Sequence, residues 1–238
     1  MVTIAFYVRK GGAGKSTLSY IMACTAARAG RKVLLVGLDP QGDAVRWASG
    51  KDRPLRRDDP VESPYGFTAI YSPGRMPSVP SDKDLVIVDC PPEPDDAVPL
   101  VKPNLWVVAL DGRAALIDTL PVIPAMKAQC EFILFLLNKA DAGGARVESA
   151  LREAAGKVPD TSIWRESIPF SGALDRVAEY AAPPWDVPYG KESEGWIVLE
   201  RFFARLLDVV ALIEKAGQVA APAPSTPKPG VRKPRRNR

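Results

Sequence analysis

The chain alternates short, nearly continuous apolar runs with longer stretches of helical composition. Such runs are typical of strands in a parallel sheet, because these strands are covered on both faces. Strands that alternate with helices predict an α/β fold, a doubly wound and mostly parallel sheet flanked by helices. We expect strands at residues 2–8, 32–38, 84–90, 104–110 and 131–138, and helices at 16–30, 113–128, 144–157 and 195–215.

The pattern fits a single domain over residues 1–217. The last helix carries apolar residues at helical spacing and should pack on the sheet. These residues are Ile197, Phe202, Leu206, Val209 and Ile213. Residues 51–64 are polar and are expected to form a loop. From residue 218 onward the sequence is rich in Ala, Pro and basic residues with little to bury, so 218–238 is expected to be a disordered tail.

The distribution of charge changes this picture more than its total. The formal net charge of the 238 residues is +4, but the predicted tail contains six basic residues and no acidic one. The remaining 217 residues therefore have a net charge of −2. A basic tail favours a polyanionic partner such as DNA, and the alternative is a tail that only keeps the protein in solution.

Composition excludes several kinds of chemistry. The chain has no histidine, so no imidazole base or ligand is available. Cys24, Cys90 and Cys130 are far apart with no CxxC, which argues against a disulfide framework or a cysteine zinc site; we expect reduced, half-buried thiols. No apolar window approaches the length of a membrane span, and the N-terminal apolar run is too short for a signal peptide, so we expect a cytoplasmic protein.

A glycine-rich stretch, "KGGAGKST" at residues 10–17, stands between the first predicted strand and the first predicted helix. Backbone N–H groups of such a loop can close around phosphate oxygens, and the helix N-terminus adds partial positive charge. In this interpretation Lys15 reaches the β and γ phosphates, and the Ser16 hydroxyl can bind Mg²⁺. The alternative is a glycine-rich turn that happens to precede a lysine.

Two aspartates follow other predicted strands. Asp39 lies in "LDPQGDA" and Asp89 ends the apolar run in "DLVIVDCPP". The carboxyl ends of neighbouring parallel strands face one crevice, so both carboxylates should meet the glycine-rich loop. Asp89 could then hold a magnesium-bound water near the γ-phosphate. A lone aspartate after a strand is more often a turn residue, and the convergence of three motifs is what favours a nucleotide site.

These three stretches resemble the deviant Walker A, Walker A′ and Walker B motifs of the ParA/MinD family of P-loop ATPases. The sequence DPQ followed by Trp47 is most similar to small ParA partition proteins. The resemblance covers roughly residues 1–215, with its specific motifs in the first 92. It implies an ATP hydrolase with ATP and Mg²⁺ as cofactors.

The resemblance also implies roles for individual residues. The implied catalytic residues are Lys10, Lys15 and Asp39. Lys10 would cross a dimer interface to the partner's phosphates, and Asp39 would orient the attacking water. Ser16 and Asp89 would bind the metal. The nucleotide is held by Gly11, Gly12, Ala13, Gly14, Lys15, Ser16 and Thr17, with Asn138 and Pro169 at the base. The string "NKAD" leaves guanine as a minor alternative to adenine.

For partners, the resemblance implies an ATP-dependent homodimer that binds DNA without sequence preference and associates with the nucleoid. A ParB-like or cargo adaptor protein would stimulate hydrolysis, and no membrane is expected. Arg201 and Arg205 on the last helix are candidate DNA contacts, although a solvated helix face explains them equally well. The alternative is a MinD-like membrane-positioning ATPase. An iron–sulfur carrier or reductase on the same fold would need paired cysteines, which the spacing of Cys24, Cys90 and Cys130 does not offer.

Two departures from the family pattern stand out. Gly37 replaces the first aspartate of the usual D-x-D-P-Q, which removes an acidic group near the magnesium waters and predicts slow hydrolysis. Residues 111–118 lack the prolines common at this place in the family, so no interface role is assigned to them.

Overall fold

A sheet of eight strands forms the centre of the molecule in the order β3-β4-β2-β5-β1-β6-β7-β8, and only the β3–β4 pair is antiparallel. The computed structural model describes residues 1–50, 53–130, 132–139 and 145–220. The strands are β1 (Val2–Tyr7), β2 (Val33–Gly37), β3 (Pro60–Glu62), β4 (Thr68–Tyr71), β5 (Leu85–Asp89), β6 (Leu105–Leu110), β7 (Ile133–Leu137) and β8 (Ser162–Ile163). The helices are α1 (Lys15–Arg28), α2 (Asp43–Ser49), α3 (Pro94–Ala97), α4 (Arg113–Thr119), α5 (Ile123–Gln129), α6 (Ala145–Gly156), α7 (Gly172–Tyr180) and α8 (Glu194–Ala220), with 3-10 turns η1 (Val98–Leu100), η2 (Leu120–Val122) and η3 (Pro184–Asp186).

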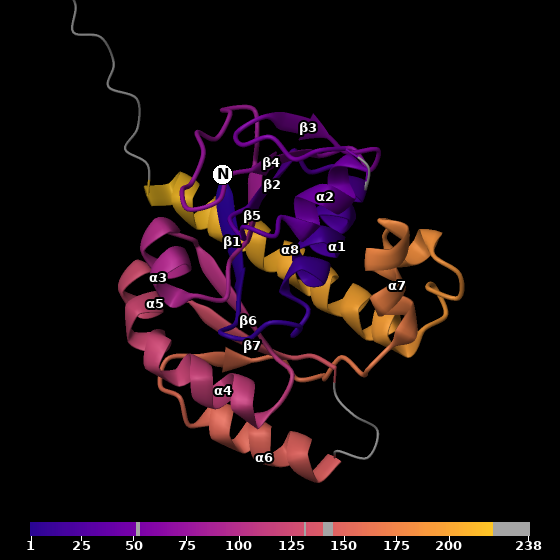
Figure 1. The fold of residues 1–238 in the computed structure, drawn as a ribbon. Helices are drawn as coiled ribbons and strands as arrows, with labels where there is room; N and C mark the ends of the chain where they lie inside the picture. Colours follow the sequence, from indigo (N-terminus) through magenta and orange to yellow (C-terminus); the bar gives the residue numbers. More distant parts are fainter. Residues whose placement is uncertain (51–52, 131, 140–144, 221–238) are drawn as a thin grey trace, which may run out of the picture.

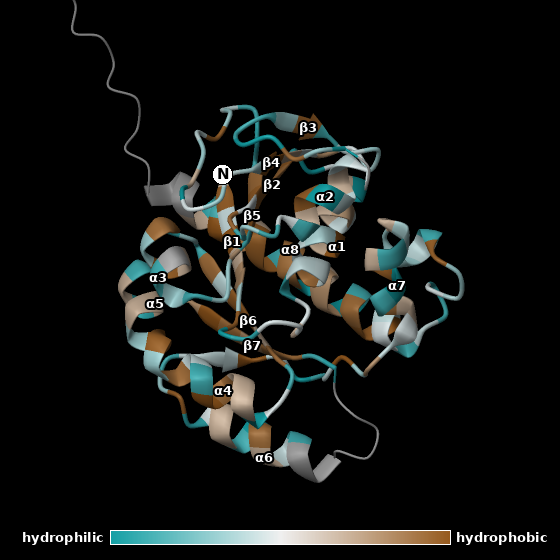
Figure 2. Cartoon of the chain, in the orientation of Figure 1, coloured by the Kyte–Doolittle hydropathy of each residue, from teal (hydrophilic) through white to brown (hydrophobic). Residues whose placement is uncertain are grey.

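Helices cover both faces of this sheet, as expected for a doubly wound fold. One apolar cluster joins the sheet to α1, α2, α7 and α8, and a second joins it to α3, α4, α5 and α6 (Figure 1). Successive residues of β1 supply the two clusters in turn, because side chains alternate across a strand. Ile4 and Phe6 belong to the first cluster, Ala5 and Tyr7 to the second. Apolar residues are accordingly concentrated in the central strands (Figure 2).

The five predicted strands are confirmed as β1, β2, β5, β6 and β7. The helix predicted over 113–128 is instead α4, η2 and α5, because Pro121 and Pro124 lack the N–H that a continuous helix needs there. The loop predicted over 51–64 contains β3, which adds antiparallel to β4. Residues 51 and 52 lie outside the described part, as do 131 and 144.

The last helix is longer than predicted and buries a somewhat different face. It extends from Glu194 to Ala220, and Phe202 and Leu206 are buried as expected. Ile197, predicted to pack on the sheet, is 43% exposed, while the adjacent Leu199 is fully buried. Of the predicted tail, residues 221–238 lie outside the described residues.

The three cysteines are buried, with at most 8% of each residue exposed, and not half-buried as expected. Cys24 lies on α1, Cys90 directly after β5, and Cys130 directly after α5. They therefore belong to three separate parts of the fold, and Cys24 is in a different apolar cluster from the other two.

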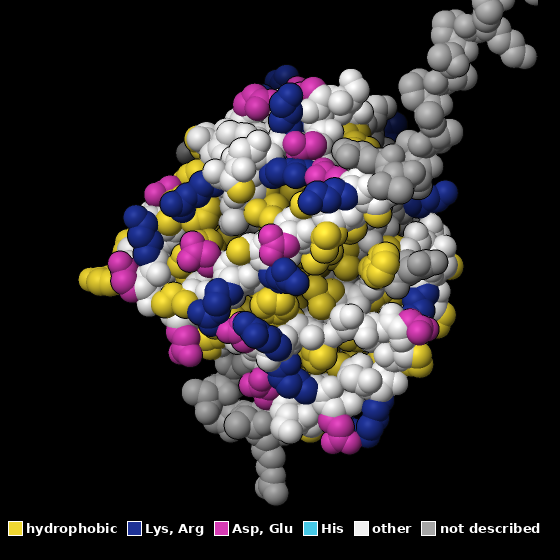
Figure 3. Space-filling model, turned by 180° about the vertical axis from the view of Figure 1, so that it is seen from behind, with side chains coloured by type: hydrophobic (Ala, Val, Ile, Leu, Met, Phe, Trp, Pro, Cys, Tyr) yellow, Lys and Arg dark blue, Asp and Glu magenta, His cyan; other side chains and the backbone are white. Residues whose placement is uncertain are grey.

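Seen from behind, the surface mixes Lys and Arg with Asp and Glu side chains, and apolar side chains gather between them (Figure 3). A groove of about 820 Å³ lies where α8 passes the start of β7. Its lining is mostly apolar and includes the exposed Phe132 and Leu212. Among the described helices, none combines the length and apolar character needed to cross a membrane.

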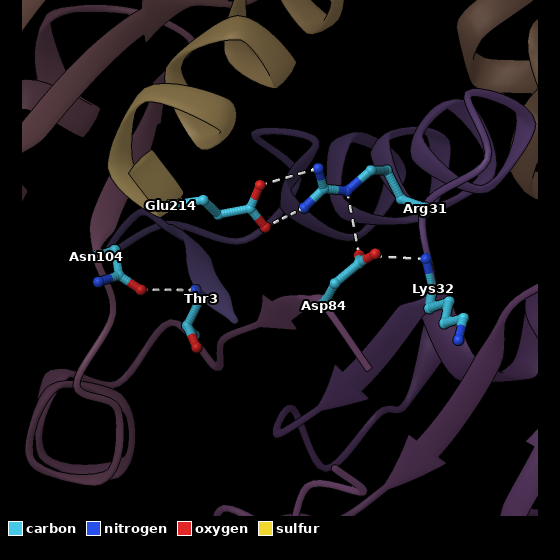
Figure 4. A network of polar contacts seen from close by, with 6 residues as sticks. All are labelled: Thr3, Arg31, Lys32, Asp84, Asn104 and Glu214. Atoms are coloured by element: carbon cyan, nitrogen blue, oxygen red, sulfur yellow. Dashed lines mark hydrogen bonds and ion pairs between the residues drawn. The ribbon is translucent and has the colours of Figure 1, made fainter. Parts of the chain in front are cut away.

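A polar network links α8 to the segment between α1 and β2 and to the residue before β5 (Figure 4). Arg31, just after α1, donates both to Glu214 on α8 and to Asp84, which precedes β5. Asp84 also accepts the backbone N–H of Lys32 at 3.1 Å. These contacts raise the pKa of Arg31, with the hydrogen bond to Glu214 as the main cause. One guanidinium thus ties together α1, β2, β5 and the C-terminal helix.

We expect Glu214→Gln to lower the free energy of unfolding by about 1 kcal/mol, because it removes one charge from a partly exposed, charge-assisted pair. Urea unfolding followed by circular dichroism measures the change. Glu200→Gln, an exposed substitution on the same helix, is the matched control and should leave stability unchanged. Equal stability of the two variants would contradict a stabilising role for the Arg31 network.

Candidate nucleotide-binding site

The carboxyl ends of β1, β2 and β5 meet at one edge of the sheet, as the sequence predicts. Asp89 is in register with Phe6 on one side and with Gly37 on the other. The glycine-rich loop follows β1, and Asp39 follows β2 by two residues. The three motifs that lie apart in the sequence are therefore brought together by strand order alone.

A polar pocket of about 400 Å³ opens at this edge. Residues from all three motifs and from the following helices line it: Gly11, Gly12, Gly14, Lys15, Ser16, Thr17, Asp39, Pro40, Gln41, Asp43, Trp47, Pro92, Glu93 and Lys139. The glycine-rich loop leads directly into α1, a helix of 14 residues. Its first residues, Lys15, Ser16 and Thr17, line the pocket. Unpaired N–H groups and the helix dipole make such an end suited to anions.

Asp89 lies beneath the pocket with its carboxylate fully buried. Neither oxygen has a hydrogen-bond partner of standard geometry, which is costly for a charged group. Burial raises the pKa of Asp89 to about 7, while the nearby Ser16 hydroxyl and Lys15 ammonium lower it. A carboxylate beside a serine hydroxyl is a donor set that suits Mg²⁺, so these residues fit the metal that the motif implies.

Both lysines of the loop are engaged within the chain. The Lys15 side chain is 6% exposed, and its ammonium donates to the Lys10 carbonyl at 3.4 Å. The Lys10 ammonium contacts both carboxylate oxygens of Asp111, at 2.9 and 3.2 Å. Lys10 thus points to the end of β6 and does not line its own chain's polar pocket.

Asp39 is held in a tight turn at the mouth of the pocket. Its carboxylate accepts the Gln41 backbone N–H at 2.9 Å, and Asp39 lines the pocket. Gly37, where the family pattern has an acidic residue, packs closely on α2. A Cβ at Gly37 would lie 2.7 Å from Val45 Cγ2, so the departure from the family pattern coincides with a lack of space.

The residues expected at the base lie together in a neighbouring space. Asn138 and Pro169 line a small cavity of about 20 Å³ that shares Gly14, Thr17 and Lys139 with the polar pocket. That volume holds one or two water molecules. The Asn138 amide is buried and donates to the Ala13 carbonyl at 2.8 Å, so it also supports the loop. A Cβ on Gly14, which has a φ of 90°, would lie 2.5 Å from this amide.

Sequence reasoning missed four charged residues of the site. Asp43, Glu93 and Lys139 line the polar pocket, and Asp111 pairs with Lys10. The signal for Asp43 and Lys139 is their position one to four residues after a strand end or motif already identified. Asp111 stands in the 111–118 stretch to which no role was assigned, and its place next to Lys10 depends on the pairing of β1 with β6.

This fold and site define the chain as a nucleotide-binding α/β domain with a glycine-rich phosphate loop. Residues 4–184 match the CobQ/CobB/MinD/ParA nucleotide binding domain, and the chain belongs to that family. A segment of 42 residues is 54% identical to the chromosome-partitioning ATPase Soj of Thermus thermophilus. This match spans 18% of the present chain and 17% of Soj.

Solved structures confirm the fold at low sequence identity. An ATP complex of Cyanothece McdA has a TM-score of 0.68 and 15% identity, covering 89% of this chain and 96% of McdA. Aquifex aeolicus MinD has a TM-score of 0.67 and 16% identity, covering 87% and 98%. Mycobacterium smegmatis cobyrinic acid a,c-diamide synthase with ADP and magnesium has a TM-score of 0.64 and 18% identity, covering 87% and 94%. Two of these structures hold an adenine nucleotide, ATP in the McdA complex and ADP with magnesium in the synthase.

We expect Gly37→Asp, which restores the residue of the family pattern, to lower the free energy of unfolding by about 1–3 kcal/mol through overpacking against Val45. Thermal and urea unfolding measure the loss. Combining it with Val45→Ala should recover more stability than the sum of the two single changes predicts, because the smaller residue makes room. Strict additivity of the two changes would show that Val45 is not what excludes a side chain at position 37.

Proposed function

We propose that this chain is a ParA-like ATPase that converts ATP and water to ADP and phosphate. The observation that carries the proposal is the buried, unpartnered Asp89 carboxylate beneath a glycine-rich loop that presents Lys15 and Ser16. A buried charge of this kind needs a compensating cation. A nucleotide–magnesium complex supplies one at the place where the loop accommodates phosphates.

In the proposed reaction, the oxygen of water bonds to the γ-phosphorus and the bond to the β–γ bridging oxygen breaks. That oxygen keeps the electron pair, ADP departs, and the proton of water passes to the released phosphate. The protein contributes positioning and charge stabilisation. Asp39 orients the water, Lys15 holds the phosphate oxygens, and Lys10 adds charge from the partner subunit. When bound, Mg²⁺ held by Ser16 and Asp89 neutralises charge on the β and γ oxygens.

We assign the adenine to the space beside Asn138 and Pro169. Its volume of about 20 Å³ is far below what a purine needs, so the Pro169 segment has to move outward for the base to enter. The exposed Phe170 ring, 61% accessible, is then free to cover the base. Asp141 of the "NKAD" string, on which the guanine alternative depends, lies outside the described residues.

We propose an ATP-dependent homodimer as the working form, because Lys10 faces away from its own phosphate pocket and is 43% exposed. A lysine that completes the site of a second chain makes turnover depend on pairing. Gly37 leaves Asp39 with one acidic neighbour fewer, and we expect slow turnover until a ParB-like or cargo adaptor protein binds.

DNA is the polyanion that we propose for the dimer. Arg201 and Arg205 are 50% and 64% exposed, but each pairs with an acidic side chain, Glu166 and Asp208 respectively. Positive and negative side chains are also interspersed on the face of the molecule seen from behind (Figure 3). The six basic residues from position 228 onward have no acidic neighbour in sequence. We therefore assign the larger share of phosphate contacts to the tail, where each contact steepens the salt dependence by roughly 0.9 log units.

Lys15→Ala should abolish ATP binding, because it removes the buried ammonium that faces the phosphate pocket. Isothermal titration calorimetry with Mg²⁺–ATP measures this. Lys10→Ala is the informative control: we expect it to retain nucleotide affinity and to lose ATPase activity. Unchanged affinity in Lys15→Ala would reject the assignment of the phosphate loop.

Asp39→Ala should stop hydrolysis after ATP has bound, so that an ATP-bound dimer stays on DNA. Co-sedimentation with a long DNA duplex measures retention, and the exposed Asp82→Ala is the control. The salt concentration is varied from about 50 to 200 mM, because affinity that depends on phosphate contacts falls steeply over this range. The same protein is added to anionic lipid vesicles. Sedimentation with vesicles and not with DNA would favour the MinD-like alternative, and continued turnover would remove Asp39 from its assigned role.

A further inference from the structure

We propose that Asp111 holds the Lys10 ammonium inside its own chain and thereby opposes the ATP-dependent dimer. Asp111 is then a positioning residue that sets how readily Lys10 is released to a second chain. The inference rests on the proposed function, since it concerns the lysine that the dimer would use. It adds to that function a competing contact within each single chain.

The contact is close and involves both carboxylate oxygens. Lys10 Nζ lies 2.9 Å from Asp111 Oδ2 and 3.2 Å from Asp111 Oδ1. The two side chains differ in exposure, 43% for Lys10 and 12% for Asp111. Within the part of the chain that the structure describes, no other cation forms an ion pair with Asp111. The carboxylate is thus mostly buried and depends on Lys10 for its compensating charge.

The pairing follows from the register of the sheet. Tyr7 on β1 is paired with Val108 on β6 in a parallel ladder. Lys10 follows Tyr7 by three residues and Asp111 follows Val108 by three, so the two side chains emerge side by side at the same edge. The fold therefore brings an acidic residue to a place where it can neutralise a lysine at this position of the loop.

A second contact links this pair to the nucleotide. The Lys15 ammonium donates to the backbone carbonyl of Lys10. Phosphate binding by Lys15 would take that donor away and leave the Lys10 segment held by Asp111 alone. The two contacts are thus broken in order. ATP breaks the contact of Lys15 with the Lys10 carbonyl, and a second chain then breaks the contact of Lys10 with Asp111.

This order of events predicts what removing the Asp111 charge does. In Asp111→Asn the lysine is free before a partner arrives, and the dimer no longer gives up an internal ion pair. Because each dimer releases two such pairs, we expect its dissociation constant to fall by roughly two- to thirty-fold, the range for two partly exposed pairs. Asp111→Glu retains the charge and should behave nearly as the natural sequence does.

The first experiment needs neither nucleotide nor dimer. Lysine side chains of the nucleotide-free full-length protein are acylated with a trace amine reagent, and the rate at Lys10 is read by peptide mass spectrometry. We expect Lys10 to react several-fold faster in Asp111→Asn than in the natural sequence or in Asp111→Glu. Asp118→Asn, which removes an exposed charge from the same segment, is the matched control. Equal rates at Lys10 in all four proteins would overturn the inference.

The second experiment measures dimerisation by sedimentation equilibrium with a non-hydrolysable ATP analogue and Mg²⁺. Tighter dimers in Asp111→Asn, with Asp118→Asn unchanged, support the inference. A dissociation constant equal to that of the natural sequence overturns it and leaves the proposed ATP dimer intact. Weaker dimers also overturn it, because Asp111 would then contribute to the interface. If the natural sequence and Asp111→Asn both remain monomeric, the inference and the proposed dimer fail together.

Discussion

The parallel pairing of β1 with β5 and β6 is the constraint on which the site depends. It places the glycine-rich loop between two strand ends that each carry an aspartate, Asp89 on one side and Asp111 shortly after the other. Two different electrostatic settings lie on the two sides of this strand. On the β5 side lies a buried carboxylate without a partner, and on the β6 side lies a carboxylate already paired with Lys10. The loop is positioned by hydrophobic burial of β1, and its chemistry is decided by its neighbours.

Burial of Asp89 is unfavourable for the isolated chain, and its pKa of about 7 reflects this. Without a bound metal ion, the nearby Lys15 ammonium offsets only part of the cost of burying this charge, and the packing of β5 between β1 and β2 has to offset the rest. A bound cation removes the penalty. The apolar core thus holds open a site that becomes electrostatically favourable only when occupied, which is how preorganised ion sites discriminate in favour of their ligand.

How much could be predicted from the sequence depended on the length and continuity of each pattern. The five central strands were predictable because each is apolar on both faces, and the motifs at their ends were predictable with them. β3, β4 and β8 have three, four and two residues, too few to establish a period, and η2 interrupts a helix through prolines placed inside an otherwise helical composition. The contact of Lys10 with Asp111 required the register of β1 and β6, and the reason for Gly37 required the position of Val45. Neither is encoded locally.

Three polar groups in or beside the glycine-rich loop are already paired within the chain. Lys15 donates to the backbone of its own loop, Lys10 is neutralised by Asp111, and Asn138 holds the Ala13 carbonyl. Each of these three groups therefore has an internal partner that a ligand or a second chain must replace. Such replacement costs part of the intrinsic binding energy, so affinity is lower than the contacts alone would give. The proposed order of exchange then couples the two ends of the loop, because phosphate binding at Lys15 changes the contacts of Lys10.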